Sequence, residues 1–415
     1  MEEEGRWYVG IDWASEEHQV CLLDADGDVL GERVVAHSGD GLAELCSWLG
    51  ELTGGEPSRI HVSIEVPHGA VVETLLERGF VVHAINPKQL DRFRDRFTVA
   101  GAKDDRRDAR VLADSLRTDA RCFRLLRVDE PLVIELREMS RLAEDLKQEQ
   151  VRFGHRVRQQ LRRYYPQMLE IEADVSANWF LDLWELVPTP DKARRVRESS
   201  IARVLGKHRI RKTDAASVRA ALQQTPLHVA PGTTEAATAH IQALIERMRL
   251  SNKQLRDCYR SIDKLCARLS ASEETTPGQK REQRDVQILS SLPGVGRIVL
   301  ATLLAEASQP LQARDYHAIR SLAGTAPVTR QSGKRTMVVM RKACHHRLRN
   351  ALYHWARVAV QRDARSRQRY SALRQRGHSH GRALRSVADR LLAVACAMLR
   401  AQTEYDPERA LPLVA

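Results

Sequence analysis

The sequence predicts an α/β domain followed by an all-α remainder, with long helices of coiled-coil type between the first and last parts. Short runs rich in β-forming residues alternate with amphipathic stretches over residues 6–120. Apolar residues then recur at helical spacing in two long stretches, near 132–168 and 241–269. A chain of 415 residues is too long for one core, so we expect domains at 1–125, 126–284 and 285–415.

The first domain is expected to begin with three antiparallel strands at 6–12, 18–24 and 28–36, and the turn "DADGD" at 24–28 suits a hairpin. The pattern then predicts, in order, a helix at 40–53, a strand at 59–65, a helix at 68–78, a strand at 80–85 and further helices. This order is typical of an α/β sheet. Ligands of such sheets bind at strand ends near the first strand.

The composition points to a polyanionic partner. The formal net charge is +12 and the isoelectric point is near 9.6. Because Lys and Arg gain affinity by neutralising phosphates, nucleic acid is the leading candidate, and a merely soluble basic surface is the alternative. The seven cysteines are scattered and form no C-x-x-C pair, which favours reduced thiols over structural zinc. Neither a leader nor a membrane-spanning apolar run is recognisable, so the expected location is the bacterial cytoplasm.

The two long helical stretches of the middle region allow an antiparallel pair, a dimer contact or simple spacers. The first apolar stripe comprises Leu136, Met139, Leu142, Leu146, Phe153, Val157, Leu161 and Tyr164. Residues 271–284 are predicted to be a polar linker.

The C-terminal domain is expected to be mostly helical. Residues 288–306, "ILSSLPGVGRIVLATLLAE", predict a helix, a Pro-Gly-x-Gly turn and a second helix, as in a helix-hairpin-helix. In that motif, backbone N–H groups near Gly294 and Gly296 would receive a phosphate. An ordinary turn between two helices is the alternative.

Four acidic residues carry the main chemical prediction. Asp12 ends the first strand, Glu65 ends the fourth, and Asp105 and Asp108 share one helical face. If the first and fourth strands are neighbours, the four carboxylates converge, and their mutual repulsion implies bound divalent metal. Two Mg²⁺ ions about 4 Å apart can stabilise the attacking and leaving oxygens of a phosphodiester. Each acid alone is weak evidence, and Asp104 offers a rival register with Asp108.

A glycine-containing loop near residue 332 places a serine among cations. Its basic neighbours are Arg330, Lys334, Arg335, Arg341 and Lys342. A serine hydroxyl needs a base, a metal or phosphate-binding cations to become a nucleophile. From the residues alone, Ser332 is a plain loop residue.

With these motifs, the sequence resembles the IS-one-ten family of insertion-sequence transposases along nearly its whole length. The resemblance lies in "VGIDWASEEHQVCLLD", "IEVPHG", "INPKQLDRFR", "AKDDRRDARVLADSL", "LSSLPGVG", "SLAGTAPVTRQSGKR" and "RLRNALYHWA". It implies an RNase H/RuvC-like domain in front and a serine-bearing transposase domain behind. The family's K-x-D-x-x-D-A pattern falls on Lys103, Asp105, Asp108 and Ala109. Its acids therefore fall on Asp12, Glu65, Asp105 and Asp108, and its catalytic serine on Ser332.

The resemblance also implies a reaction and partners. Ser332 would hold a DNA strand as a phosphoserine, while Mg²⁺ on the acids of another protomer completes the site. An element-encoded bridge RNA would select donor and target DNA, and the coiled coil would assemble dimers into a tetramer. Many relatives have a Ser-Ser-Gly-Gly loop where this chain reads "RQSGKR", so Ser321 and Thr329 are alternative hydroxyls. The competing functions are a structure-selective DNA junction nuclease that uses the acids alone and a non-enzymatic nucleic-acid-binding regulator.

Overall fold

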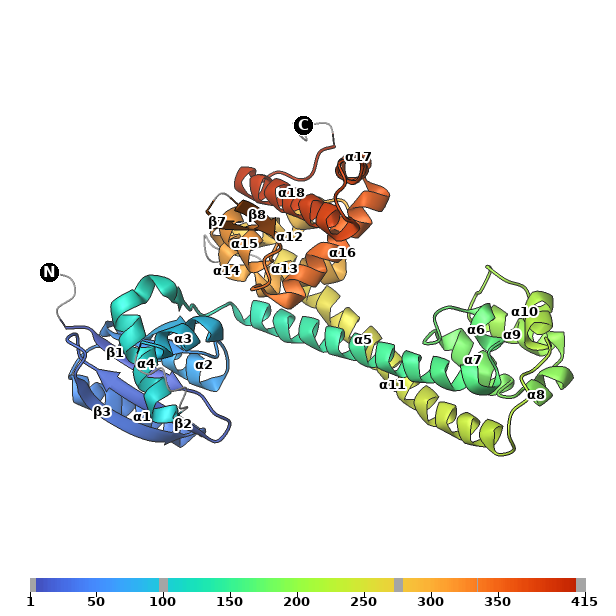
Figure 1. The fold of residues 1–415 in the computed structure, drawn as a ribbon, viewed down its shortest axis with the longest axis horizontal. Coiled ribbons are helices and arrows are strands. Elements are labelled where there is room, and N and C mark those ends of the chain that lie inside the picture. Colours follow the sequence, from blue (N-terminus) through green and yellow to red (C-terminus); the bar gives the residue numbers. More distant parts are fainter. Residues whose placement is uncertain (1–4, 97–103, 272–278, 334, 408–415) are drawn as a thin grey trace. The chain divides into compact units, whose positions relative to one another are not determined.

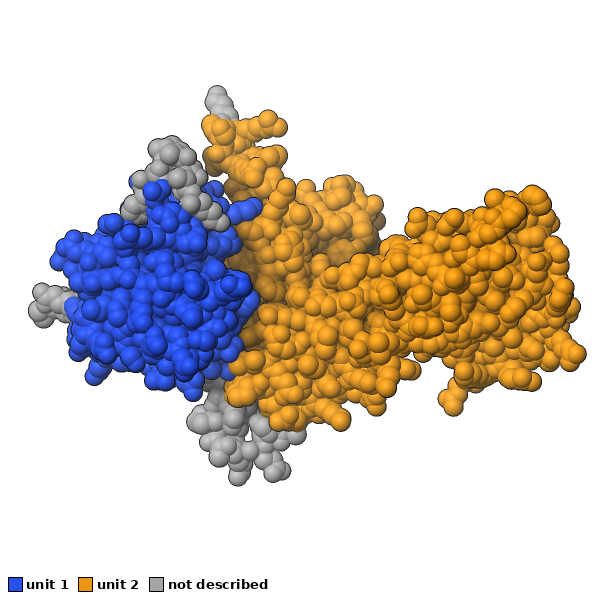
Figure 2. All heavy atoms as spheres, turned by 90° about the horizontal axis from the view of Figure 1, so that it is seen from below, with its two compact units in different colours: residues 1–129 blue, residues 130–415 orange. Residues whose placement is uncertain are grey.

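The computed structural model describes residues 5–96, 104–271, 279–333 and 335–407 (Figure 1). The chain divides into two compact units, residues 1–129 and 130–415, which are coloured separately in Figure 2. A mixed α/β sheet occupies the first unit and the second is mostly helical, as the sequence predicts. In the described part of the chain, no helix is long and apolar enough to cross a membrane.

Unit 1 is built on a six-stranded sheet with the order β3-β2-β1-β4-β5-β6. Strands β1, β2 and β3 are antiparallel, β4 and β5 run parallel to β1, and the short β6 is antiparallel to β5. The first and fourth strands are therefore neighbours, which was the condition for the acids to converge. The strands are β1 Trp7–Asp12, β2 Glu17–Leu23, β3 Val29–Ala36, β4 Ile60–Ile64, β5 Val81–Ala84 and β6 Arg124–Leu125.

Helices cover both faces of this sheet. Apolar side chains of α1 and α2 share one core with Val9 and Ile11 of β1, whereas α4 packs on the opposite face against Cys21 and Leu23 of β2. Alternation along the strands produces the two faces, since successive side chains point to opposite sides. The helices of unit 1 are α1 Gly39–Thr53, η1 Pro57–Arg59, α2 Ala70–Glu77, α3 Pro87–Arg94, α4 Asp105–Asp119 and η2 Ala120–Cys122.

Gly10 lets α4 lie directly on β1. A Cβ at this position would be 1.9 Å from the carbonyl oxygen of Ala109 and 2.6 Å from the amide nitrogen of Ala113. Only a residue without a side chain therefore permits this approach. The contact holds the beginning of α4 next to the end of β1, where the predicted acids lie.

Unit 2 contains an antiparallel pair of long helices, α5 Pro131–Tyr164 and α11 Thr233–Ala271, which run side by side in Figure 1. Met139 contacts Cys258, and Gln150 contacts Asn252, so residue numbers fall along one helix as they rise along the other. The two stretches thus pair within the chain. Leu142 does not belong to the buried stripe, since 44% of its surface is exposed.

The far end of this helix pair carries a small helical module with its own core. Trp184, Phe180, Tyr164 and Tyr165 are almost fully buried there together with apolar residues of α11. The sequence analysis named no element between the two long stretches, whereas the structure has several short helices there. They are α6 Met168–Ile171, α7 Asn178–Leu186, α8 Pro190–Arg195, α9 Glu198–Lys207 and α10 Ala215–Leu222.

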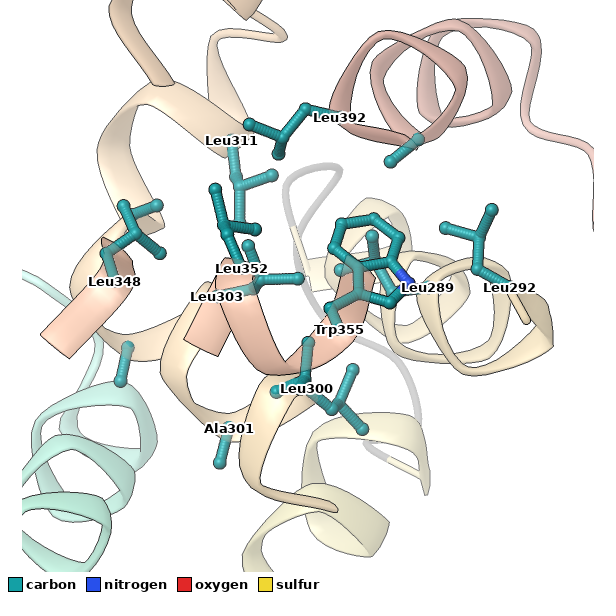
Figure 3. Packing of buried hydrophobic residues seen from close by; sticks show 14 of the residues in the cluster. Leu289, Leu292, Leu300, Ala301, Leu303, Leu311, Leu348, Leu352, Trp355 and Leu392 are labelled. Carbon is teal, nitrogen blue, oxygen red and sulfur yellow. The ribbon is translucent and has the colours of Figure 1, made fainter. Parts of the chain in front are cut away.

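The C-terminal part of unit 2 is organised around the buried Trp355, which packs among leucines of several helices (Figure 3). The predicted linker at 271–284 is wrong for its last residues, because α12 begins at Gln279, and 272–278 lie outside the described residues. The elements are α12 Gln279–Ser291, α13 Arg297–Glu306, α14 Ser308–Gln312, α15 Tyr316–Leu322, β7 Val328–Ser332, β8 Arg335–Val339, α16 His346–Arg362, α17 Ala364–Gln375 and α18 His380–Ala401.

The turn between α12 and α13 packs on α16. Gly294 has a φ of 84°, and a Cβ there would be 2.8 Å from the amide nitrogen of Ala359. The indole Nε1 of Trp355 donates a 2.9 Å hydrogen bond to the carbonyl of Pro293. Gly296, the N-cap of α13, is exposed and has open space where a Cβ would stand. The first half of the turn therefore has a packing role, and phosphate binding by Gly294 and Gly296 stays a prediction.

Candidate active site

Asp12 and Glu65 lie at the same edge of the sheet. Strands β1 and β4 are parallel, and Ile11 pairs with Ile64. Asp12 is the last residue of β1 and Glu65 directly follows β4, so the next position along each strand carries a carboxylate. Both residues are half-buried.

The carboxylate of Asp12 shares an electrostatic neighbourhood with the other predicted acids. Burial is the main reason that its pKa is raised to about 6. The negative charges of three carboxylates raise this pKa in addition, in the order Asp108, Asp105 and Glu65, while the positive charge of Arg94 lowers it. We refer to Asp12, Glu65, Asp105 and Asp108 as the acidic cluster.

Asp108 is the most buried member of the acidic cluster, with 2% of its side chain exposed. Arg94, at the end of α3, holds it with two hydrogen bonds: Nε donates to Oδ1 at 2.7 Å and Nη2 to Oδ2 at 2.9 Å. Arg94 also donates to Asp91 at 2.6 Å. This bidentate pair satisfies the buried charge of Asp108. Sequence reasoning missed Arg94, because its role depends on the contact between α3 and α4.

Asp104 and Asp105 have different positions at the start of α4. Asp104 is the N-cap, and its side chain accepts a hydrogen bond from the amide of Arg106 at 3.2 Å. Asp105 is exposed in the first turn, where the partial positive charge of the helix end stabilises an anion. Asp104, which the sequence offered as an alternative to Asp105 beside Asp108, therefore caps the helix.

The acidic cluster has the hard oxygen donors that Mg²⁺ prefers, and a divalent cation would relieve its repulsion. As placed, however, no three His, Cys, Asp or Glu residues of the described ranges are close enough together to hold one ion. Arg94 supplies the positive charge at Asp108 instead. The donor set therefore fits a metal in kind, and a metal at Asp108 has to compete with Arg94.

Ser332 lies in a β-hairpin, although the sequence analysis expected a loop. It is the last residue of β7 and pairs with Arg335, the first residue of β8. The turn contains Gly333, with a φ of 54°, and Lys334, which lies outside the described residues. Ser332, Arg330 and Arg335 are exposed. Among the described residues, no hydrogen bond to the hydroxyl of Ser332 is formed.

The other predicted cations and hydroxyls lie on the hairpin or in the segments next to it in sequence. Arg341 and Lys342 follow β8, Arg341 being half-buried and Lys342 exposed. Thr329 is exposed on β7, and Ser321 lies on α15. The structure thus places Ser332 at the tip of the hairpin and both basic residues at its exit.

The chain matches two known family descriptions. Residues 9–166, which contain the acidic cluster, match the DEDD domain of IS110, described as "Transposase". Residues 286–371, which contain the serine hairpin, match "Transposase IS116/IS110/IS902 family". The chain belongs to the IS110 family of transposases. The resemblance to the IS-one-ten family is confirmed, and a transposase is an enzyme that cuts and rejoins DNA.

Individual relatives agree with this family. The IS110-family chain is 62% identical to "Putative transposase y4uE" of Sinorhizobium fredii over 216 residues, which are 52% of this chain and 60% of that protein. It is 29% identical to "Mini-circle putative transposase for IS117" of Streptomyces coelicolor, over 97% of this chain and 96% of that protein. It is also 29% identical to "Insertion element IS116 uncharacterized 44.8 kDa protein" of Streptomyces clavuligerus, over 97% and 96%. DEDD transposases are generally metal-dependent.

Proposed function

We propose that this IS110-family transposase excises and inserts an insertion sequence with Mg²⁺ on the acidic cluster and Ser332 as the nucleophile. The arrangement of the acids carries the metal part of the proposal, because the pairing of Ile11 with Ile64 sets Asp12 and Glu65 at one edge of the sheet. The pKa of Asp12 agrees with this, since burial raises it first and the three other carboxylates raise it in addition. Carboxylates gathered at the ends of neighbouring strands are costly to fold without a cation. A metal ion bound to these carboxylates would offset the repulsion between them.

The four residues of the acidic cluster have different roles in this proposal. Asp12, Glu65 and Asp105 would supply oxygen ligands, because they are exposed or half-buried. Asp108 would join them when Arg94 releases it, or would orient its neighbours while it stays paired. When bound, Mg²⁺ would neutralise the phosphodiester and stabilise the attacking and leaving oxygens.

The hairpin supplies the nucleophile. The Oγ of Ser332 attacks a phosphorus of the DNA strand, so an Oγ–P bond forms while a P–O bond to the leaving strand breaks. The departing oxygen takes up a proton, and a strand hydroxyl later reverses the step and releases the serine. Arg330, Lys334 and Arg335 would hold the phosphate during both transfers. As the resemblance implies, activation of this hydroxyl would come from the metal-bearing domain of another protomer.

The finer expectations of the resemblance belong to the same proposal. The antiparallel β3-β2-β1 strands followed by parallel β4 and β5 support a RuvC-like interpretation of unit 1. The basic composition supports an element-encoded bridge RNA as a partner. Assembly into a dimer or tetramer is proposed on the resemblance alone, whereas the helix-hairpin-helix at 288–306 and the three-domain division are proposed on the sequence pattern.

A covalent adduct tests the nucleophile. The purified transposase is incubated with Mg²⁺ and donor DNA, denatured, digested and examined by mass spectrometry for a nucleotide attached at Ser332. Ser332→Ala should abolish the adduct, whereas Ser321→Ala and Thr329→Ala should retain it. An adduct that persists in Ser332→Ala would contradict the assignment.

A junction nuclease is the second candidate. It is favoured by one observation, namely that all four acids of the acidic cluster belong to unit 1, whereas Ser332 belongs to unit 2. In that case Ser332→Ala would still cleave a branched DNA, and Asp12→Asn would not. The same two variants therefore separate the two functions.

A further inference from the structure

Three arginines outside the predicted site lie at the beginnings of two helices in unit 2. Arg349 is in the first turn of α16, and Arg382 and Arg385 are in the first two turns of α18. Neither helix has an acidic residue in its first turn. Cations are unfavourable at these ends, because the helix dipole already places positive charge there. We refer to these three residues as the arginine cluster.

The beginning of α18 lies close to the middle of α16. The rings of Tyr353 and His380 are 6.5 Å apart between centroids, with one residue on each helix. Burial, followed by the charges of Arg349 and Arg382, lowers the pKa of the Arg385 guanidinium below its usual value. The three positive charges therefore repel one another across the two helices.

None of the three forms an ion pair with a described residue, although other arginines nearby do. Arg347, two residues before Arg349, pairs with Glu144 at 3.2 Å and Asp145 at 3.4 Å. Arg347 is on the same helix as Arg349, and the fold provides it with two carboxylates of α5. The arginine cluster has no such carboxylate among the described residues.

Arg349 is held firmly in this position. Its Nη2 donates to the backbone carbonyls of Arg341 at 2.6 Å and Lys342 at 3.2 Å, just after β8. A Cβ on Gly324, whose φ is 70°, would be 2.8 Å from the same nitrogen, so glycine makes room for the guanidinium. The Nε atoms of Arg349 and Arg341 are buried without a hydrogen-bond partner among the described residues. These two Nε donors therefore have no hydrogen-bond partner, and Arg349 has no ion pair, among the described residues.

We propose that the arginine cluster binds backbone phosphates of the DNA strand that the serine hairpin acts on. Phosphate oxygens match guanidinium donors in geometry and would neutralise the repulsion between the three side chains. The bonds from Arg349 to the residues after β8 connect the cluster with the exit of the hairpin that carries Ser332. The identity of the strand rests on the proposed function, whereas phosphate binding does not require catalysis.

Binding of a random-sequence DNA duplex to the full-length protein, measured by fluorescence anisotropy at several salt concentrations, tests the proposal. Arg382→Gln and Arg385→Gln are suitable variants, because neither side chain makes a hydrogen bond to a described residue. Each should weaken binding, and the slope of log affinity against log salt should become shallower by about 0.9 per lost phosphate contact. Arg385→Lys should retain part of the affinity, because it keeps the charge.

Arg260→Gln is the matched control, since it removes one exposed arginine from α11, and the ion pair of Arg260 within the described ranges is with Asp257. Its salt slope should stay within error of wild type. Unchanged affinity and slope in both cluster variants would overturn the proposal. So would a loss of RNA affinity alone, which would make the site an RNA site. A site for free anions would show inorganic phosphate raising the melting temperature of wild type but not of the variants, with DNA binding unchanged.

The outcomes remain separable from those of the adduct experiment. If no adduct forms at Ser332 but the cluster variants bind DNA more weakly, only the nucleophile assignment fails. If the adduct forms and DNA binding is unchanged in the variants, only the arginine cluster fails.

Discussion

The acidic cluster of unit 1 and the arginine cluster of unit 2 each bring like charges together, but only the first contains its own counter-ion. Arg94 neutralises Asp108, whereas no described carboxylate pairs with Arg349, Arg382 or Arg385. Burial raises the pKa of Asp12 and lowers that of Arg385, so in both places the charged form is disfavoured. The two clusters therefore differ in what a ligand of opposite charge would meet: at the acidic cluster it would have to displace Arg94 from Asp108 or bind beside it, whereas the arginine cluster has no counter-ion among the described residues.

Both clusters also depend on glycines that allow close backbone approach. Gly10 admits α4 to β1 beside the acids, and Gly324 admits the guanidinium of Arg349. A side chain at either position would separate the charged groups. The crowding is therefore built into the backbone of each unit.

The largest expected effect comes from removing the counter-ion of the acidic cluster. Arg94→Gln leaves the buried carboxylate of Asp108 unpaired, which should cost about 3–5 kcal/mol of stability without metal. Chemical denaturation in the presence of EDTA measures this loss, and saturating Mg²⁺ should recover part of it. Arg96→Gln is the control, because Arg96 and Asp119 form a more exposed pair that contributes about 1 kcal/mol or less. An Arg94→Gln protein as stable as wild type in EDTA would refute the counter-ion role.

The next effect concerns the backbone contact that positions the acids. Gly10→Ala would place a methyl group 1.9 Å from the carbonyl oxygen of Ala109, so α4 must move. Overpacking of this kind should destabilise unit 1 by about 1–3 kcal/mol or more. The acids should also separate, and metal affinity measured by calorimetry should fall. Gly50→Ala, which meets no atom within 4 Å, should do neither.

Asp12→Asn should stabilise the metal-free protein while it abolishes DNA cleavage. The folded-state pKa of Asp12, about 6, exceeds its ordinary value of 3.8, so the folded state binds the proton more tightly. Stability from this group is therefore present at low pH and is lost as pH rises from about 4 to about 6. Because the residue is half-buried, the gain from the variant at pH 8 should be roughly 1 kcal/mol. Melting temperatures across this pH range measure it, and equal curves for both proteins would contradict it.

The smallest effect is the corresponding relief in the arginine cluster. Arg385→Gln should raise the stability of the DNA-free protein by roughly 0.2–0.5 kcal/mol, as expected for removing one member of a partly exposed like-charge group. Calorimetry of the free protein detects it. A destabilised variant would mean that Arg385 contributes mainly through packing.

The first five strands of the sheet were predictable from the sequence because period-two alternation is a local signal, whereas the two-residue β6 is too short to show one. The predicted strand at 59–65 and the observed β4 Ile60–Ile64 differ by one residue at each end, and the neighbouring positions of β1 and β4 place Asp12 and Glu65 at one edge. The short helices α7–α10 were not predictable, since each has too few turns to show a period. Leu142 fits the apolar stripe by spacing, but nothing covers it in the described structure.

The contacts that define the two clusters were beyond sequence reasoning for a different reason. The pairing of Arg94 with Asp108 joins two helices whose connection includes residues 97–103, and the arginine cluster joins helices separated in sequence by α17. A high density of arginine was visible in the C-terminal part, but spacing along the chain does not show which charges meet. The same limit applies to the hairpin at Ser332, whose strands are short and mostly exposed.

The antiparallel arrangement of α5 and α11 has a consequence for protein engineering. The chain enters the small helical module, whose core contains Trp184, after Gln150 and returns from it at Asn252. The side chains of Gln150 and Asn252 are hydrogen-bonded to each other. Everything between them has a separate hydrophobic core. A short linker that joins the two helices near this pair should thus yield a truncated transposase whose C-terminal part still folds, and which would reveal what the excised segment contributes to transposition.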